Sequence, residues 1–149
     1  MKRRRLTVLA TAAAAGALLI TAANASAATP KFTLTASIAG GITQVSTGDP
    51  ITFVFTETNN SHRATPEDIV VKYAHNVRVN LYSCGGGSAD GRWCEPGFVS
   101  PGHSVSMDVY ATATGDAGTV AAARACLINE NTGVWGQCRT AKAEISAAS

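Results

Sequence analysis

Apolar and polar residues alternate with a period of two over most of the chain beyond residue 31. Residues 32–38 read FTLTASI, residues 51–56 read ITFVFT, and residues 104–113 read SVSMDVYATA. Alternation of this kind is typical of β-strands that bury one face and expose the other. These three segments are therefore predicted to be strands, and the third shows the pattern most clearly.

Turn-forming residues separate the predicted strands. Gly40-Gly41 and Gly48-Asp49-Pro50 mark turns, and a polar loop is expected from residue 59 to residue 68. The other segments predicted to be strands are 69–73 with 77–82, 92–95, 119–128 and 134–145. Residues 69–82 can form either two strands or one bent strand. Alanine in 119–125 favours helix by propensity, but turn signals on both sides favour a strand.

The number and spacing of these segments predict the fold class. Seven or eight short strands, with no convincing amphipathic helix between them, are typical of an all-β protein in which two antiparallel sheets pack face to face. The expected architecture is therefore an antiparallel β-sandwich.

The first 27 residues differ from the rest of the chain. Lys2 and three arginines precede an apolar run from Leu6 to Ala23, and Ala25-Ser26-Ala27 follows it, which is the pattern of a secretory signal with its cleavage site. A membrane anchor is the alternative, since spanning a bilayer takes about 20 residues, but the run is rich in alanine and no basic cluster follows it. We expect a cleaved signal peptide at 1–27, a single domain at 28–149 and a secreted, extracellular protein.

Removal of the signal peptide changes the net charge. The chain has 12 Lys and Arg against 10 Asp and Glu, and four of the basic residues lie at positions 2–5. The remainder is therefore mildly acidic and contains no run of basic residues. Nucleic acid and anionic membranes are bound mainly through cationic patches, so neither is expected as a partner.

Four cysteines lie in the predicted mature domain, at positions 84, 94, 126 and 138. An even number in an exported chain predicts two disulfides. Three pairings are possible, and we favour Cys84 with Cys94 and Cys126 with Cys138, because each pair brackets a short, turn-rich loop between neighbouring strands. The spacing contains no Cys-x-x-Cys pair, so neither zinc nor another cofactor is expected.

Several motifs resemble those of the immunoglobulin-like repeat domains of bacterial secreted and surface proteins. Residues 48–59 read GDPITFVFTETN, Trp93-Cys94 leads to SPGHSVSM at 100–107, and GTV follows at 118–120. In that family a Gly-Asp motif opens the second strand and a Pro-Gly-x-Ser motif opens a later one. The resemblance covers most of residues 31–128 and implies an immunoglobulin-like sandwich in an extracellular, non-catalytic protein.

A second resemblance concerns the segment from Cys84 to Phe98. Cys84-x9-Cys94 followed by EPGF at 95–98 is similar to the neocarzinostatin-like apoproteins of the enediyne chromoproteins that actinomycetes secrete. This resemblance implies a carrier that holds an apolar small molecule in a cleft lined partly by a disulfide. The chain departs from that family by a longer segment before Cys84 and a wider spacing of the second cysteine pair.

The sequence contains no recognisable catalytic set. Residues 86–90 read GGSAD, which lacks the final glycine of a Gly-x-Ser-x-Gly elbow. His62, His75 and His103 lie at predicted turns without the spacing of metal ligands. The carboxylates at 90, 95, 108 and 116 are too scattered to indicate paired-acid chemistry. An enzyme is therefore not expected.

The two tryptophans are the best candidates for ligand contact. Trp93 adjoins Cys94, and Trp135 lies between the other two cysteines, so both rings are expected on disulfide-braced loops that present rigid apolar area. The alternative is that each indole packs over its own disulfide. Supporting residues, chosen by proximity in sequence, are Tyr82, Arg92 and Phe98.

These observations together predict a non-enzymatic immunoglobulin-like binding or interaction module of the bacterial extracellular space or cell envelope. Its partner is expected to be an extracellular protein, a glycan or an apolar small molecule. The alternative function is the carrier of an apolar small molecule that the second resemblance implies.

Overall fold

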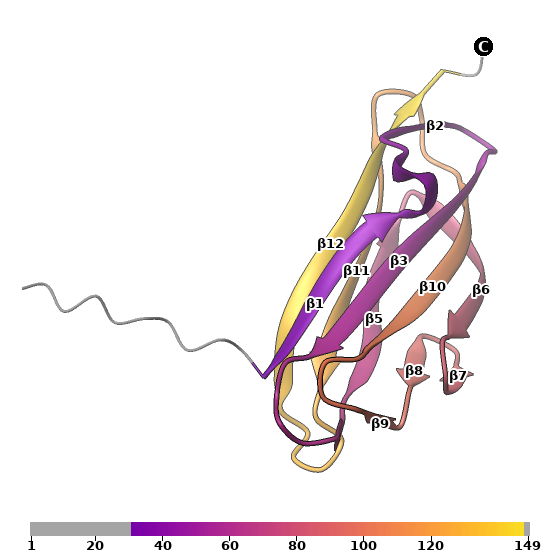
Figure 1. The fold of residues 1–149 in the computed structure, drawn as a ribbon. Helices are drawn as coiled ribbons and strands as arrows, with labels where there is room; N and C mark the ends of the chain where they lie inside the picture. The colour runs from indigo at the N-terminus through magenta and orange to yellow at the C-terminus, as the bar shows by residue number, and fades with distance from the viewer. Residues whose placement is uncertain (1–30, 148–149) are drawn as a thin grey trace, which may run out of the picture.

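Two β-sheets face each other across an apolar core (Figure 1). The computed structural model describes residues 31–147, so the predicted signal peptide at 1–27 lies outside the described residues. The predicted all-β sandwich with two disulfides is confirmed. No helix among residues 31–147 is both long enough and apolar enough to cross a membrane.

The four-stranded sheet has the order β1-β3-β10-β6. Its strands are β1 (Phe32–Ile38), β3 (Pro50–Asn59), β10 (Ser104–Ala113) and β6 (Val77–Cys84). The six-stranded sheet has the order β2-β12-β11-β5-β8-β7. Its strands are β2 (Gln44–Ser46), β12 (Trp135–Ser146), β11 (Val120–Ile128), β5 (Asp68–His75), β8 (Trp93–Glu95) and β7 (Ser88–Asp90).

Two smaller elements complete the structure. β4 (Thr65–Pro66) and β9 (Phe98–Val99) form a two-stranded ladder, and η1 (Ala39–Gly41) is a short 3-10 turn after β1. The strand pairs are antiparallel, with one exception: β2 runs parallel to the end of β12. The short strands β2, β4, β7 and β9 raise the number of strands above the predicted seven or eight.

Alternation along the strands builds the core. Phe53 and Phe55 of β3 are fully buried, and the residues between and beside them face outward. In β11, Ala121, Ala123 and Ala125 occupy alternate buried positions of the same core cluster. Small side chains from one sheet and aromatic rings from the other fill the space between the layers. The alanine-rich segment is therefore a strand, as predicted, despite its helix propensity.

Residues 69–82 form two strands that belong to different sheets. Asn76 lies between β5 and β6 with a φ of 54°, a left-handed conformation that asparagine adopts more readily than most residues. β5 pairs with β11 in one sheet, and β6 pairs with β10 in the other. The chain thus crosses the sandwich at Asn76.

The polar loop predicted for residues 59–68 is only partly correct. Asn59 is the fully buried last residue of β3, and Glu67 and Asp68 are buried at the start of β5. The side-chain amide of Asn59 donates hydrogen bonds to the carbonyl oxygens of Arg63 (2.9 Å) and Val99 (2.6 Å). Asn59, Glu67 and Asp68 therefore belong to the interior at this end of the sandwich, whereas His62 and Arg63 between them are exposed.

Both predicted disulfide pairings are confirmed, but the bonds have different positions. Cys126 and Cys138 lie directly opposite each other on the neighbouring strands β11 and β12. Cys84 lies on β6 of the four-stranded sheet and Cys94 on β8 of the six-stranded sheet. The expectation that each disulfide joins neighbouring strands thus holds for one pair, and the other pair links the two layers.

Candidate functional site

Both tryptophans lie on strands of the six-stranded sheet, Trp93 on β8 and Trp135 on β12, so the expectation that they lie on loops is wrong. Trp93 of β8 is opposite Val70 of β5, Val70 is opposite Cys126 of β11, and Cys126 is opposite Cys138 of β12. Residues paired in register point to the same side of a sheet, so these side chains form one row. The row lies on the outer side because Cys94, the neighbour of Trp93, is buried in the core.

Trp135 joins this outer side one row further along. It is opposite Ile128, which is two residues beyond Cys126 in β11. Ile128 is 9% exposed and Val70 3% exposed, although neither belongs to the central core. Each indole thus lies beside a shielded aliphatic residue, while Trp135 itself remains 45% exposed. One side of the Trp135 ring can therefore pack on the sheet while the exposed part remains available to contact a ligand.

A β-bulge brings two more side chains to this surface. Tyr73 is opposite Arg124 and Val71 is opposite Ala125, so Lys72 is an extra residue in β5. Such a bulge turns the extra residue and its neighbour toward the same side, and both Lys72 and Tyr73 are exposed. The Lys72 ammonium lies 3.5 Å from the centroid of the Trp135 ring, a cation–π contact that holds the lysine over the sheet.

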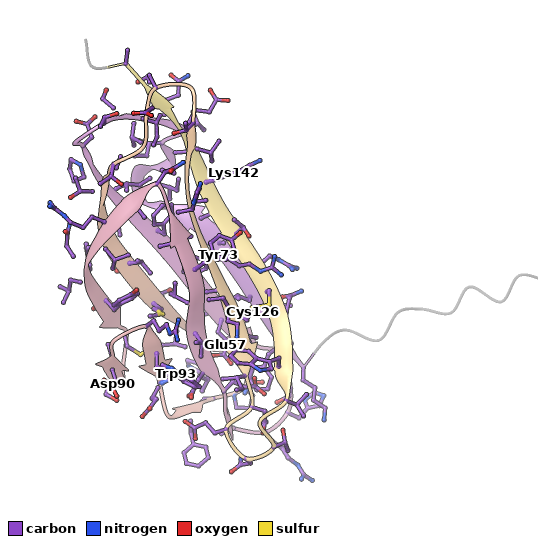
Figure 2. All side chains as sticks on the ribbon, turned by 180° about the vertical axis from the view of Figure 1, so that it is seen from behind. Glu57, Tyr73, Asp90, Trp93, Cys126 and Lys142 are labelled. Atoms are coloured by element: carbon purple, nitrogen blue, oxygen red, sulfur yellow. A yellow bond between two sulfur atoms is a disulfide. The ribbon has the colours of Figure 1, made fainter. Side chains whose placement is uncertain are left out.

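Three cations of the six-stranded sheet gather on the outer side. Lys72 comes from β5, Arg124 from β11 and Lys142 from β12, and Lys142 lies opposite Ala122, two residues from Arg124. Among the residues that the structure describes, neither Arg124 nor Lys142 forms an ion pair. Figure 2 shows Lys142, Tyr73 and Cys126 in succession along this side. We call Lys72, Tyr73, Arg124, Trp135 and Lys142 the aromatic–cationic face.

The sequence contains the residues of this face, but they are far apart along the chain. The three cations are far apart in the chain, so no basic run marks them. Arg124 and Lys142 lie at outward positions between buried alanines of predicted strands. A comparison of outward positions between paired strands would have found them, but the pairing of strands was not predictable.

The other candidate residues are placed apart. Arg92 precedes Trp93 in the turn before β8, where its carbonyl oxygen accepts a hydrogen bond from the Val71 amide (2.9 Å). Tyr82 lies on β6 of the opposite sheet, half-buried against the core. Phe98 lies on β9 and is 75% exposed. The structure therefore places Arg92 beside Trp93 and separates Tyr82 and Phe98 from the aromatic–cationic face.

Phe98 lines a groove of about 400 Å³ beside the start of β10. Its walls include Gly85 and Gly86, which directly follow Cys84, together with Val99 and Val105. This volume lies within the range of about 300–1,000 Å³ that is usual for small-molecule sites.

Three buried carboxyl groups occupy the end of the sandwich near the β11–β12 loop. Glu57 continues the inward alternation of β3 and is 0% exposed, and neither of its carboxylate oxygens has a hydrogen-bond partner in the part of the chain that the structure describes. Burial, together with the nearby carboxyl groups of Glu67 and Asp68, raises the pKa of Glu57 from 4.5 to about 8. Figure 2 labels Glu57 between the levels of Cys126 and Trp93.

Asp68 is buried at the first position of β5, and no hydrogen-bond partner for its Oδ1 is present within residues 31–147. Burial, followed by contact with the Glu130 carboxyl group, raises the pKa of Asp68 from 3.8 to about 7. Glu67 is also buried, which raises its pKa, while a hydrogen bond from Asn129 Nδ2 to its Oε1 (3.2 Å) acts in the opposite direction.

A larger cavity, about 840 Å³, lies at this same end of the molecule. Its lining includes Lys31, Phe32, His62, Arg63, Glu67 and Asn129. Within residues 31–147 no three His, Cys, Asp or Glu side chains are arranged to hold a metal ion.

The sequence matches no family model and no curated protein. Two solved structures are similar in their arrangement of strands. A FixG-related protein from Vibrio parahaemolyticus has 10% identity and a TM-score of 0.44, over 81% of this chain and 100% of that one. Self-complemented MyfA, the major subunit of Myf fimbriae from Yersinia enterocolitica, has 10% identity and a TM-score of 0.45, over 76% of this chain and 98% of that one. At these values neither similarity carries information about function.

Proposed function

We propose that this protein is an exported, non-enzymatic binding module that holds an acidic glycan on the aromatic–cationic face. The observation that supports the proposal most directly is the position of Arg124 and Lys142. Neither forms an ion pair with another described residue, and both lie on the same side of the sheet as the exposed rings of Tyr73 and Trp135. Cations without partners favour a negatively charged ligand, and aromatic rings favour a ligand with apolar surfaces.

The shape of the face supports an extended ligand. The small residues Ala122 and Thr140 lie opposite Lys142 and Arg124 respectively, so no bulky neighbour in these pairs covers either cation. A polysaccharide with carboxylate substituents offers negative charge and apolar C–H surfaces along its length. The Cys126–Cys138 disulfide joins the two central strands, and a surface that is rigid before binding loses less entropy when the ligand binds.

The location outside the cytoplasm is supported by the two disulfides, which are typical of exported proteins. The signal-peptide pattern of residues 1–27 supports the same location. We propose a role in the extracellular space or the cell envelope, with the sandwich as a scaffold for the binding face.

Affinity electrophoresis with polygalacturonate as the acidic probe and dextran as the neutral one tests this function. We expect retardation by polygalacturonate alone, and weaker retardation as salt rises from 0.1 M, where the Debye length is about 10 Å, to 0.5 M. Arg124→Ser should reduce the affinity at least fivefold. Arg78→Ser, which removes an exposed arginine from β6 of the other sheet, is the matched control.

Equal retardation of wild type and Arg124→Ser would contradict the proposal, as would a protein that neither polysaccharide retards.

A carrier of an apolar small molecule is the second candidate, and the groove beside Phe98 favours it. A large exposed ring next to a cavity of about 400 Å³ offers apolar contact area at a site of suitable size. Native mass spectrometry of protein purified from its own culture medium should then show an additional small mass. Phe98→Ala should abolish that mass, and a mass that persists in the variant would exclude this groove.

A further inference from the structure

The cavity of about 840 Å³ at the end of the sandwich is formed by segments that are distant in sequence. The loop after β3 supplies His62 and Arg63, the segment before β5 supplies Glu67, and the β11–β12 loop supplies Asn129. Figure 1 shows these loops together at one end of the molecule, the end at which β1 begins. The volume lies near the upper part of the range usual for ligand sites.

The cavity wall carries charges of both signs. Lys31, His62 and Arg63 contribute cationic or titratable groups, and Glu67 contributes a carboxyl group that is only 9% exposed. In the described part of the chain Arg63 and Glu67 line the same cavity without forming an ion pair. The opposite charges therefore do not neutralise each other.

Within residues 31–147, no cationic side chain forms an ion pair with the acidic side of the cavity. Asn129 donates the hydrogen bond to Glu67, and Glu57, whose charge interacts with that of Glu67, has no hydrogen-bond donor on either oxygen. Burying carboxyl groups without a donor is unfavourable. A ligand ammonium group at Glu67 would supply donors and positive charge where both are missing.

The basic side of the cavity is held in place by the end of β3. Asn59 accepts a hydrogen bond from the Ser61 amide (2.8 Å) and donates one to the Arg63 carbonyl oxygen (2.9 Å). Since Asn59 is fully buried, these bonds hold the backbone of the loop that carries His62 and Arg63 against the end of β3.

We infer that this cavity binds a short peptide with free ends, its ammonium group at Glu67 and Asn129 and its carboxylate at Arg63 and Lys31. A zwitterion can pair with both the acidic and the basic side of the cavity, whereas a ligand with a single charge can pair with only one of them. The cavity is separate from the aromatic–cationic face, and the inference does not depend on the glycan proposal.

Isothermal titration calorimetry of the mature protein with trialanine tests the inference. Trialanine should bind, and N-acetyl-trialanine and trialanine amide should each bind at least tenfold more weakly.

Two variants separate the two ends of the ligand. Glu67→Gln should bind trialanine and its N-acetyl form equally, and Arg63→Gln should bind trialanine and its amide equally. Glu144→Gln and Arg78→Gln change exposed residues on β12 and β6 and should retain the wild-type preferences. Failure of trialanine to bind, or equal binding of all three peptides to wild type, would overturn the inference.

Discussion

At the scale of single residues, Glu57 is the clearest departure from the rule that inward positions are apolar. It lies on the inward side of β3 after Phe53 and Phe55, fully buried and without a hydrogen-bond partner. The protein therefore folds with a carboxyl group that is more stable protonated than ionised, because burial and two nearby carboxyl groups raise its pKa to about 8.

Stability should consequently fall as the pH rises. Between the ordinary pKa of 4.5 and the folded-state value of about 8, the folded protein retains a proton that the unfolded chain has lost. The pKa of Asp68 rises from 3.8 to about 7 on folding, so between these pH values Asp68 also lowers stability as the pH rises. We expect the free energy of unfolding to be roughly 2–4 kcal/mol larger at pH 5 than at pH 8, as measured by urea denaturation at both values.

Glu57→Gln should remove much of this dependence and should stabilise the protein at pH 8, since the amide is never ionised. Asp108→Asn, a change on the outer side of β10, serves as the control and should leave the slope unchanged. If the free energy of unfolding of the wild-type protein were the same at pH 5 and pH 8, ionisation of Glu57 would not destabilise the folded state.

Trp135 allows a second prediction at this scale. The ring is about half exposed and one side carries the Lys72 ammonium, so Trp135→Ala should cost only about 1 kcal/mol of stability. Retention by polygalacturonate should fall at least fivefold. If urea denaturation instead shows a loss above about 3 kcal/mol, the indole is mainly a packing element.

At the scale of strands and turns, alternation predicted β1, β3 and β10 well, because in each of them the inward positions are buried and the positions between them are more exposed. The division between β5 and β6 could not be predicted, since it depends on the positive φ of Asn76 and on a change of sheet. The short strands β7 and β8 owe their pairing to tertiary contacts, which single segments do not reveal.

The glycines after Cys84 also have a role that composition does not show. A Cβ atom on Gly87 would lie 2.6 Å from Pro96 Cα and would overlap the carbonyl group of Glu95. The chain requires glycine there for close approach of two backbone segments, and not only for flexibility.

Gly87→Ala should therefore destabilise the protein by about 2 kcal/mol or more, because backbone atoms cannot move aside as a flexible side chain can. Ser88→Ala, at the exposed neighbouring position, should have little effect. Thermal unfolding of both variants measures the difference, and equal melting temperatures would show that the segment rearranges freely.

At the scale of the whole molecule, folding separates charges that the sequence mixes. Mild net acidity suggested a surface without cationic patches, yet the fold gathers cations on the six-stranded sheet and buries carboxyl groups at one end. The sequence identified the two tryptophans as candidates but not Lys72, Arg124 or Lys142 as their neighbours. Proximity in sequence also suggested Tyr82, which the fold places on the opposite sheet.

The two disulfides allow a prediction about the stability of the whole fold. Each closes a short loop and should contribute roughly 3 kcal/mol on the chain-entropy account. Replacing Cys84 and Cys94 together by alanine should lower the free energy of unfolding by about this amount, and so should the Cys126/Cys138 double variant. An unchanged melting temperature after full reduction of the wild-type protein would contradict both expectations.

Because Lys72 contacts the ring of Trp135, the intrinsic fluorescence of the protein should report ligand binding at this face. The chain has two tryptophans, and among the described residues an ammonium group lies over the ring of Trp135 alone. A ligand carboxylate that draws Lys72 away from the indole would change the fluorescence of Trp135 and leave the emission of Trp93 as an internal reference. Occupancy of the sheet could then be followed in real time, without attaching a dye.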